Sequence, residues 1–142
     1  MTHAGSKRIQ EQEEEAMRQS NEEVLRHMLA LWATRDAKGM ADCFAEDGVY
    51  DNVPDNKPMV GRAAILAWLE GCFSFLDRID VEILSLASSG DWVLEERIDD
   101  HIVAGKHMRL PVANATRFKD GKIVLFRDYY CRETVKELGI AG

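Results

Sequence analysis

The chain has 142 residues, of which 46 % are apolar and 30 % charged, which is typical of one soluble globular domain. Its formal net charge of -7 argues against nucleic acid as a partner, because phosphate binding needs a basic surface. No run approaches the roughly 20 apolar residues of a membrane span, and residues 1–15 lack the apolar core of a secretory signal. Three widely spaced cysteines, an odd number, indicate reduced thiols, so we expect a cytoplasmic protein.

The beginning of the chain is predicted to be helical, with a polar lead. Residues 1–19 are rich in glutamate, and we expect an acidic tail or a frayed helix there. Ser20 and Glu23 match a capping box, which predicts a helix over residues 21–35. A second, short helix is predicted to end near Gly48, because glycine suits the left-handed exit from a helix.

Strands dominate the second half of the sequence. A short strand is predicted near residues 49–53 and a helix over residues 62–75. Four longer strands are then predicted over residues 79–87, 92–103, 107–118 and 122–132. Asp120-Gly121, between the last two, is a strong hairpin signal. Helices followed by an antiparallel meander predict an α+β domain, and no linker-like tract divides residues 20–142.

Polar residues interrupt three of the predicted strands. The interruptions are Tyr50-Asp51-Asn52, Glu96-Arg97-Ile98-Asp99 and Arg127-Asp128-Tyr129. Charge buried in a strand is costly unless it is paired. Arg97 and Asp99 are two residues apart and therefore project from the same face, whereas Arg127 points away from the face of Asp128. One arginine and two aspartates that converge in a pocket predict an acid–base site, and a structural ion-pair network is the alternative.

In this order, the three interruptions resemble the limonene-1,2-epoxide hydrolase family, and the similarity runs from about Ala41 to Arg132. The resemblance implies the cone-shaped α+β fold of the nuclear-transport-factor-type, SnoaL-like superfamily. In that fold, N-terminal helices pack on a strongly curved, mixed and mostly antiparallel sheet that encloses a deep pocket. The resemblance also implies a homodimer, a small-molecule epoxide substrate and no cofactor. The second face of the predicted strands is fairly apolar as well, so we expect a second subunit to cover it.

Carried over residue by residue, the resemblance implies a role for each polar side chain. Asp128 would be the general base, and Tyr50 and Asn52 would hold the attacking water. Asp99 would be the general acid that protonates the epoxide oxygen, and Arg97 would bridge the two aspartates. This chemistry needs one ionised and one protonated carboxyl at the same pH, and two carboxyls beside one guanidinium can share a proton. The product would be a vicinal diol, formed in one step without a covalent intermediate.

The pocket is expected to be more polar than one for a terpene epoxide. His101, Asn114 and Tyr130 stand where this family tends to have aliphatic residues, whereas Val112 stays apolar. The residues expected to line the pocket are Met28, Trp32, Leu76, His101, Val112, Asn114 and Tyr130.

Two other functions fit the same residues. An isomerase or cyclase of this superfamily needs only an aspartate base and a tyrosine, which leaves Arg97 unexplained. A non-catalytic module that binds a small molecule would reduce the charged residues to a structural relic. A metal site is not expected, because His101 and His107 have no clear third ligand.

Overall fold

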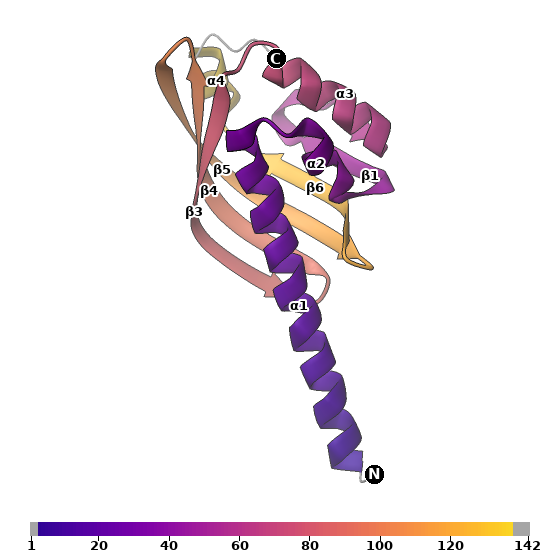
Figure 1. The fold of residues 1–142 in the computed structure, drawn as a ribbon. Coiled ribbons are helices and arrows are strands. Elements are labelled where there is room, and N and C mark those ends of the chain that lie inside the picture. The colour runs from indigo at the N-terminus through magenta and orange to yellow at the C-terminus, as the bar shows by residue number, and fades with distance from the viewer. Residues whose placement is uncertain (1–2, 138–142) are drawn as a thin grey trace.

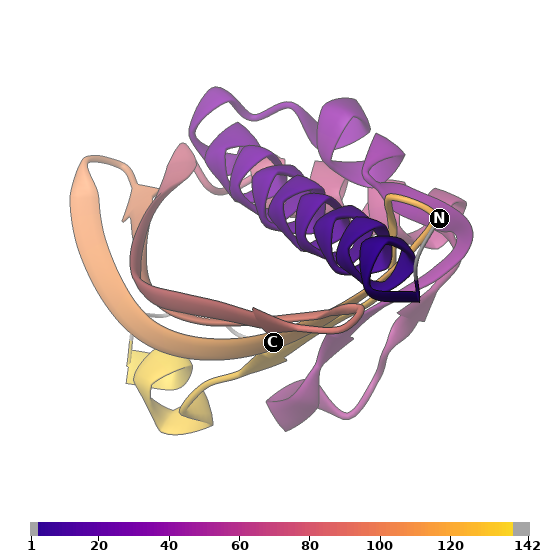
Figure 2. The ribbon, with the colours of Figure 1, turned by 90° about the horizontal axis from the view of Figure 1, so that it is seen from below.

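A computed structural model describes residues 3–137 of the chain (Figure 1). The helices are α1 (His3–Thr34), α2 (Ala37–Asp42), the 3-10 turn η1 (Val53–Asp55), α3 (Arg62–Phe73) and α4 (Arg132–Glu137). The strands are β1 (Phe44–Asn52), β2 (Met59–Val60), β3 (Arg78–Ser89), β4 (Trp92–Val103), β5 (Lys106–Lys119) and β6 (Lys122–Tyr129). Figure 2 shows the sheet curving around α1, which lies in its hollow. We call the face of the sheet toward α1 the inner face and the opposite one the outer face.

The sheet has six strands in the order β2-β1-β6-β5-β4-β3. β1 and β6 are parallel, and every other pair of neighbours in it is antiparallel. The predicted hairpin is present: Asp120 and Gly121 both have positive φ, 51° and 76°, as a tight turn between β5 and β6 requires. The prediction of an α+β domain with a mixed, mostly antiparallel sheet is confirmed.

Helix α1 begins well before residue 21, where the capping box predicted its start, and includes much of the segment for which an acidic tail or a frayed helix was expected. It starts at His3 and runs through Ser20 and Glu23, so the predicted capping box does not lie at a helix end. Its first half projects away from the sheet (Figure 1), and nearly all its side chains are exposed up to Ser20. This half is built from strong helix formers without proline, and local pairs such as Arg18–Glu15 (2.6 Å) support it. Intrinsic propensity therefore extends the helix where packing is absent.

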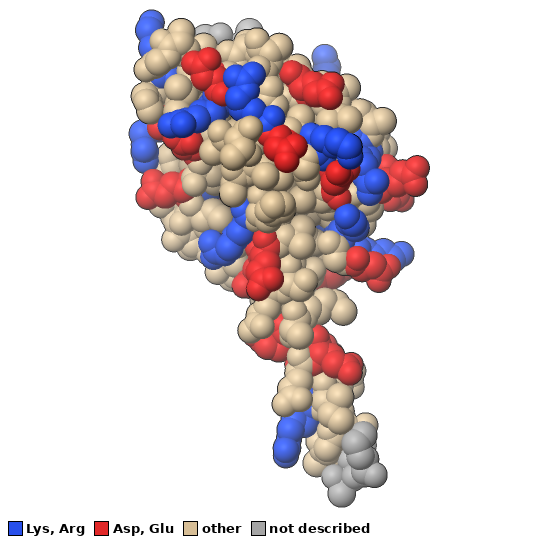
Figure 3. Space-filling model, viewed as in Figure 1, with Lys and Arg blue, Asp and Glu red and all other residues tan. Residues whose placement is uncertain are grey.

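The core fills the space between the helices and the inner face. The second half of α1 buries Leu25, Met28, Leu29 and Trp32 against it. Near the centre, the Tyr50 ring lies 4.7 Å from that of Phe126 and 4.8 Å from that of Trp68, between centroids. The surface of the molecule differs from this apolar core. Figure 3, in the view of Figure 1 with α1 in front of the sheet, shows acidic and basic side chains interspersed over it.

The prediction that Gly48 ends a helix is wrong. The short helix α2 ends at Asp42, and Gly48 lies inside β1. The pairing of β1 with β6 shifts between Phe44 and Val49. A Cβ on Gly48 would lie 2.8 Å from the carbonyl oxygen of Ile123 on β6. Glycine is needed here for a close approach of two backbones.

We therefore expect Gly48→Ala to lower the free energy of unfolding by about 1–3 kcal/mol, because the backbone of β6 has to move to admit the methyl group. Gly71→Ala in α3 is the matched control, because its Cβ would meet nothing within 4 Å. Removing a helical glycine should raise stability by about 0.5–1 kcal/mol. Urea unfolding of both variants measures the difference, and equal effects would contradict the close approach.

Candidate active site

Arg97 lies on the inner face, and its guanidinium contacts three carboxylates. Nε donates to Asp99 Oδ1 at 2.8 Å, and Nη2 donates to Asp99 Oδ2 at 3.1 Å. Nη2 also donates to Asp128 Oδ2 at 2.8 Å, and Nη1 donates to Glu95 Oε1 at 2.6 Å. The structure thus brings Arg97, Asp99 and Asp128 together, with one acid more than expected. We call these four residues the Arg97 centre.

Glu95 is the member of the Arg97 centre that the sequence analysis did not name as a site residue. The two-residue period of β4 puts Glu95, Arg97 and Asp99 on one face, so the pattern Glu-x-Arg-x-Asp was the available signal. Asp128 reaches the same point from β6. The Arg97 centre is buried: the side chains of Glu95 and Arg97 are 0 % and 1 % exposed, that of Asp128 5 %, and that of Asp99 12 %. Asp99 is the member most open to solvent.

Asp128 has a second partner, Asn114 of β5. Asn114 Nδ2 donates to Asp128 Oδ1 at 2.7 Å, and the hydroxyl of Thr116 donates to Asn114 Oδ1 at 2.5 Å. The hydroxyl fixes which end of the amide faces the carboxylate. Two protein donors therefore hold Asp128, one on each oxygen.

A row of polar side chains crosses the sheet at this level. Glu95 pairs with Asn114, Asn114 with Asp128, and Asp128 with Asn52, on the neighbouring strands β4, β5, β6 and β1. Tyr50 lies two residues before Asn52 on the same buried face of β1. Within residues 3–137, neither the Tyr50 hydroxyl nor the Asn52 amide has a hydrogen-bond partner in the protein. Both polar groups are thus available to a water or a ligand.

Burial controls the protonation of these groups. It raises the pKa of Asp128, although Arg97 acts in the opposite direction. It also raises the pKa of Glu95 to about 7, and the charges of Asp128 and Asp99 add to this rise. Burial raises the pKa of Tyr50, which the charge of Asp128 raises further. Burial disfavours the charge on Arg97, but the carboxylates outweigh it and keep its pKa well above the ordinary value.

The residues expected to line a deep pocket are placed differently. Met28, Trp32 and Leu76 are packed into the core, and Tyr130 donates from its hydroxyl to Asp55 Oδ2 at 3.1 Å. His101 is half-buried, with Nδ1 3.3 Å from the carbonyl oxygen of Met108 and thus bonded across the β4–β5 hairpin. These five residues line neither of the two hollows described next.

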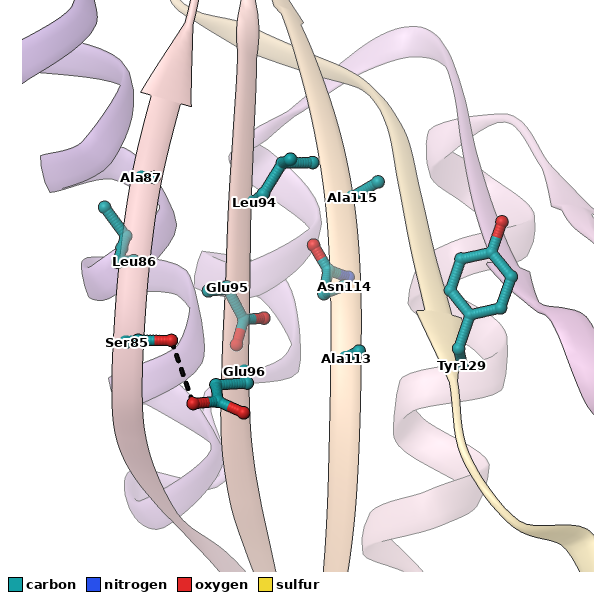
Figure 4. A pocket seen from close by; sticks show the side chains of 10 residues that line it. All are labelled: Ser85, Leu86, Ala87, Leu94, Glu95, Glu96, Ala113, Asn114, Ala115 and Tyr129. Atoms are coloured by element: carbon teal, nitrogen blue, oxygen red, sulfur yellow. Dashed lines mark hydrogen bonds between the residues drawn. The ribbon is translucent and has the colours of Figure 1, made fainter.

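Both hollows lie on the outer face of the sheet. The larger one, about 470 Å³, is bordered by β3, β4, β5 and β6, with Leu94, Glu96 and Tyr129 among its residues (Figure 4). Asn114 borders this hollow, and Val112 borders the smaller one. The polar side chains of the Arg97 centre point to the other side of the sheet. Of the seven residues expected to line a substrate pocket, Asn114 and Val112 thus border hollows of the outer face, and a pocket lined by all seven stays a prediction.

Two further observations concern the described residues as a set. No helix within residues 3–137 is both long and apolar enough to cross a bilayer. In the same range, His, Cys, Asp and Glu side chains form no group of three or more arranged to hold a metal ion.

Comparison with known proteins identifies the family. Residues 25–126 match the model of the SnoaL-like domain, so the chain belongs to this family. The chain is also 32 % identical over 87 residues to a protein described as epoxide hydrolase EphG, from Mycobacterium tuberculosis. That match covers 60 % of this chain and 56 % of EphG, so it spans little more than half of the relative.

Solved structures share the fold. An LEH-like epoxide hydrolase from Mycobacterium tuberculosis aligns with a TM-score of 0.75 and 22 % identity, over 84 % of this chain and 88 % of that one. A putative isomerase from Bacillus subtilis aligns with a TM-score of 0.75 and 24 % identity, over 87 % and 95 %. The predicted fold and the predicted resemblance are confirmed.

The raised pKa of Glu95 predicts how stability depends on pH. Between its ordinary value of 4.5 and about 7, the folded protein binds a proton that the unfolded chain has lost. The free energy of unfolding should therefore fall as pH rises through this window. In Glu95→Gln this loss, up to about 3 kcal/mol, should be absent.

Chemical unfolding at a series of pH values measures this difference. Glu46→Gln is the control, because Glu46 is exposed on β1, and its curve should run parallel to that of the wild type. A Glu95→Gln curve that also ran parallel would mean that Glu95 takes up no proton on folding.

Proposed function

We propose that the protein is an epoxide hydrolase that adds water to an epoxide and releases a vicinal diol. The observation that carries this proposal is the guanidinium of Arg97, which holds Asp99 and Asp128 at 2.8 Å each in a buried centre. The similarity to EphG supports the same reaction class. The chemistry calls only for water and for groups that accept and donate protons.

Asp128 is the general base in this proposal. Arg97 and Asn114 each donate to one oxygen of its carboxylate, and each oxygen keeps a lone pair that can accept a proton from water. Its raised pKa makes the ionised form a stronger base. Asn52 lies opposite it on β1, with Tyr50 nearby, and their free polar groups would orient the attacking water.

Asp99 is the general acid, because it is the most exposed member of the centre and accepts from Nε and Nη2 of the guanidinium, next to Asp128. As the water oxygen bonds to the ring carbon, the C–O bond of the epoxide breaks, and its electron pair stays on the ring oxygen. That oxygen takes the proton of Asp99, while Asp128 takes a proton from the water. Proton exchange then restores both carboxyls for the next turnover.

A second candidate is an isomerase or cyclase, favoured by the position of Tyr50. Burial raises the pKa of its hydroxyl and the charge of Asp128 raises it further, so a tyrosine and an aspartate base lie within electrostatic reach. Such an enzyme would rearrange its substrate without adding oxygen from water. The three acids on Arg97 have no role in that reaction, so we favour hydrolysis.

We also propose that the enzyme is a homodimer. The outer face exposes large apolar side chains on three strands, among them Leu84, Leu94 and Tyr129. An apolar patch of this kind is typical of a surface that another protein covers. A second copy, with its own outer face, is the occupant we propose.

Substitution of the two aspartates tests the proposed roles. Asp128→Asn and Asp99→Asn should each lower diol formation by about 10²–10⁴, because each amide keeps the shape but loses the proton transfer. Product analysis after incubation with aliphatic, cyclic and aryl epoxides measures this loss. The melting temperature should stay within a few degrees.

The control is Asp120→Asn in the β5–β6 turn, where asparagine tolerates the positive φ and full activity is expected. Full activity of Asp99→Asn would refute the acid assignment. Absence of diol from the wild type with every epoxide would refute hydrolysis.

The one-step mechanism predicts the fate of labelled water. In a single turnover with oxygen-labelled water, the label should appear in the diol at once, because the water attacks the ring directly. Mass spectrometry of the product measures it. Label that entered only in a second turnover would reveal an ester with a carboxylate of the enzyme, and rearranged product without label would favour the isomerase.

A further inference from the structure

Two polar side chains of β5 lie in the interior beside the Arg97 centre. Asn114 is 4 % exposed and Thr116 0 %, and the strand period places both on the inner face. The cross-strand neighbours of Thr116 are Val93 on β4 and Phe126 on β6, which are both apolar and fully buried. A hydroxyl buried among apolar side chains is costly unless it is bonded. The carboxylates already neutralise Arg97, so the presence of this polar pair calls for another explanation.

Thr116, Asn114 and Asp128 form a chain of hydrogen bonds that ends on the proposed base. The hydroxyl of Thr116 donates to Asn114 Oδ1 at 2.5 Å, and Asn114 Nδ2 donates to Asp128 Oδ1 at 2.7 Å. All three residues are buried, so bulk water does not compete for these bonds.

The bond from Asn114 fixes the plane of the Asp128 carboxylate. The torsion that turns a carboxylate about its Cβ–Cγ bond has no sharp preference of its own. Arg97 of β4 donates to Oδ2 at 2.8 Å, and this donor alone would leave the carboxylate free to turn about one contact. Asn114 of β5 donates to Oδ1, so donors on two strands hold both oxygens. The plane of the carboxylate decides where its remaining lone pairs point.

Thr116 anchors the far end of the Asn114 amide. The torsion that turns an amide about its Cβ–Cγ bond is as permissive as that of a carboxylate. An amide bonded only to Asp128 could turn together with the carboxylate and would not set its plane. The hydroxyl of Thr116 holds Asn114 Oδ1, so Nδ2 is directed at Asp128 from a fixed position.

We propose that Asn114 and Thr116 are positioning residues that hold the carboxylate of Asp128 in the orientation in which it accepts a proton from the attacking water. This inference rests on the proposed epoxide hydrolysis. Asn114 acts on the base directly, and Thr116 acts through Asn114. Neither Arg97 nor Asn114 approaches from β1, where Asn52 lies opposite Asp128 and would orient the water.

The charge state of Asp128 agrees with this role. Burial has the largest effect on the pKa of Asp128 and raises it, whereas the hydrogen bonds from Arg97 and Asn114 lower it. A bond to the charged form favours that form, and a general base has to be ionised. Asn114 therefore supports the ionised state of the base as well as its orientation.

The experiment measures kcat and KM for diol formation, with the epoxide that the wild type converts fastest. Asn114→Leu keeps the approximate size of the side chain but removes the donor to Asp128. Its kcat should fall about ten- to hundred-fold, as is typical when a hydrogen bond to a charged group is lost. KM should change little, because the bond orients the base and does not hold the substrate.

Two variants of Thr116 separate its hydroxyl from its packing. Thr116→Val keeps the shape and removes the anchor, so kcat should fall about two- to ten-fold. Thr116→Ser keeps the hydroxyl and should restore a kcat close to that of the wild type. Equal losses in these two variants, or a wild-type kcat in Asn114→Leu, would overturn the proposal.

The matched control is Ile123→Val, which removes a buried methylene from the inner face of β6 and leaves the hydrogen-bond chain in place. It should lower the melting temperature and keep the kcat of the wild type. A loss of kcat in Ile123→Val as large as that in Thr116→Val would assign the effect to packing and overturn the proposal.

The side-chain amide signals of Asn114 test the same chain without a substrate. In ¹H–¹⁵N spectra, assigned with Asn114→Leu, the amide protons should exchange slowly with water in the wild type and in Thr116→Ser. Exchange should be several-fold faster in Thr116→Val, and equal exchange in the three proteins would overturn the proposal. If Thr116→Val does not fold, Asn114→Leu carries the kinetic test. A wild type that forms no diol defeats the proposed function alone, because the amide signals still decide whether Thr116 anchors Asn114.

Discussion

The burial of one guanidinium is the interaction on which the rest of this structure depends. Removing Arg97 from water costs several kcal/mol, and only carboxylates at hydrogen-bond distance offset that cost. β4 itself supplies two of them, Glu95 and Asp99, and β6 supplies the third. A slip of one residue in β4 would turn its three members of the Arg97 centre to the outer face. The Arg97 centre therefore fixes the register of the sheet as well as the site.

The number of carboxyls around Arg97 distinguishes this centre from a simple structural ion pair. A single carboxylate would neutralise the charge of the arginine and leave no excess of acids at the centre. With three acids the Arg97 centre has more carboxyls than positive charge, and burial, opposed by Arg97, raises the pKa of Glu95 to about 7. A set of acids in different protonation states is what acid–base catalysis requires. In the proposed reaction, the buried charge that determines the register also provides a proton donor beside a proton acceptor.

The sequence periodicity of strands and the residue types of turns predicted part of the Arg97 centre and of the sheet. The strand period placed Arg97 and Asp99 on one face, and the Asp120-Gly121 turn fixed the β5–β6 hairpin. The role of Gly48 could not be read from its neighbours, because it depends on a carbonyl of β6. The sequence analysis assigned Asn114 to the pocket wall and did not predict its hydrogen bond to Asp128. That bond depends on the register in which β5 pairs with β6. The sequence indicates which face a side chain occupies, whereas long-range register decides what it touches.

The geometry around Asp128 also constrains how an epoxide would bind, if the proposed reaction holds. Arg97 approaches its carboxylate from β4 and Asn114 from β5, so the direction left for a water is toward β1, where Asn52 lies. Asp99 accepts from Nε and shares Nη2 with Asp128, so the two carboxyls lie next to each other. A guanidinium that bonds both carboxyls through one nitrogen would keep the proposed base and the proposed acid close to one substrate without any movement of the protein.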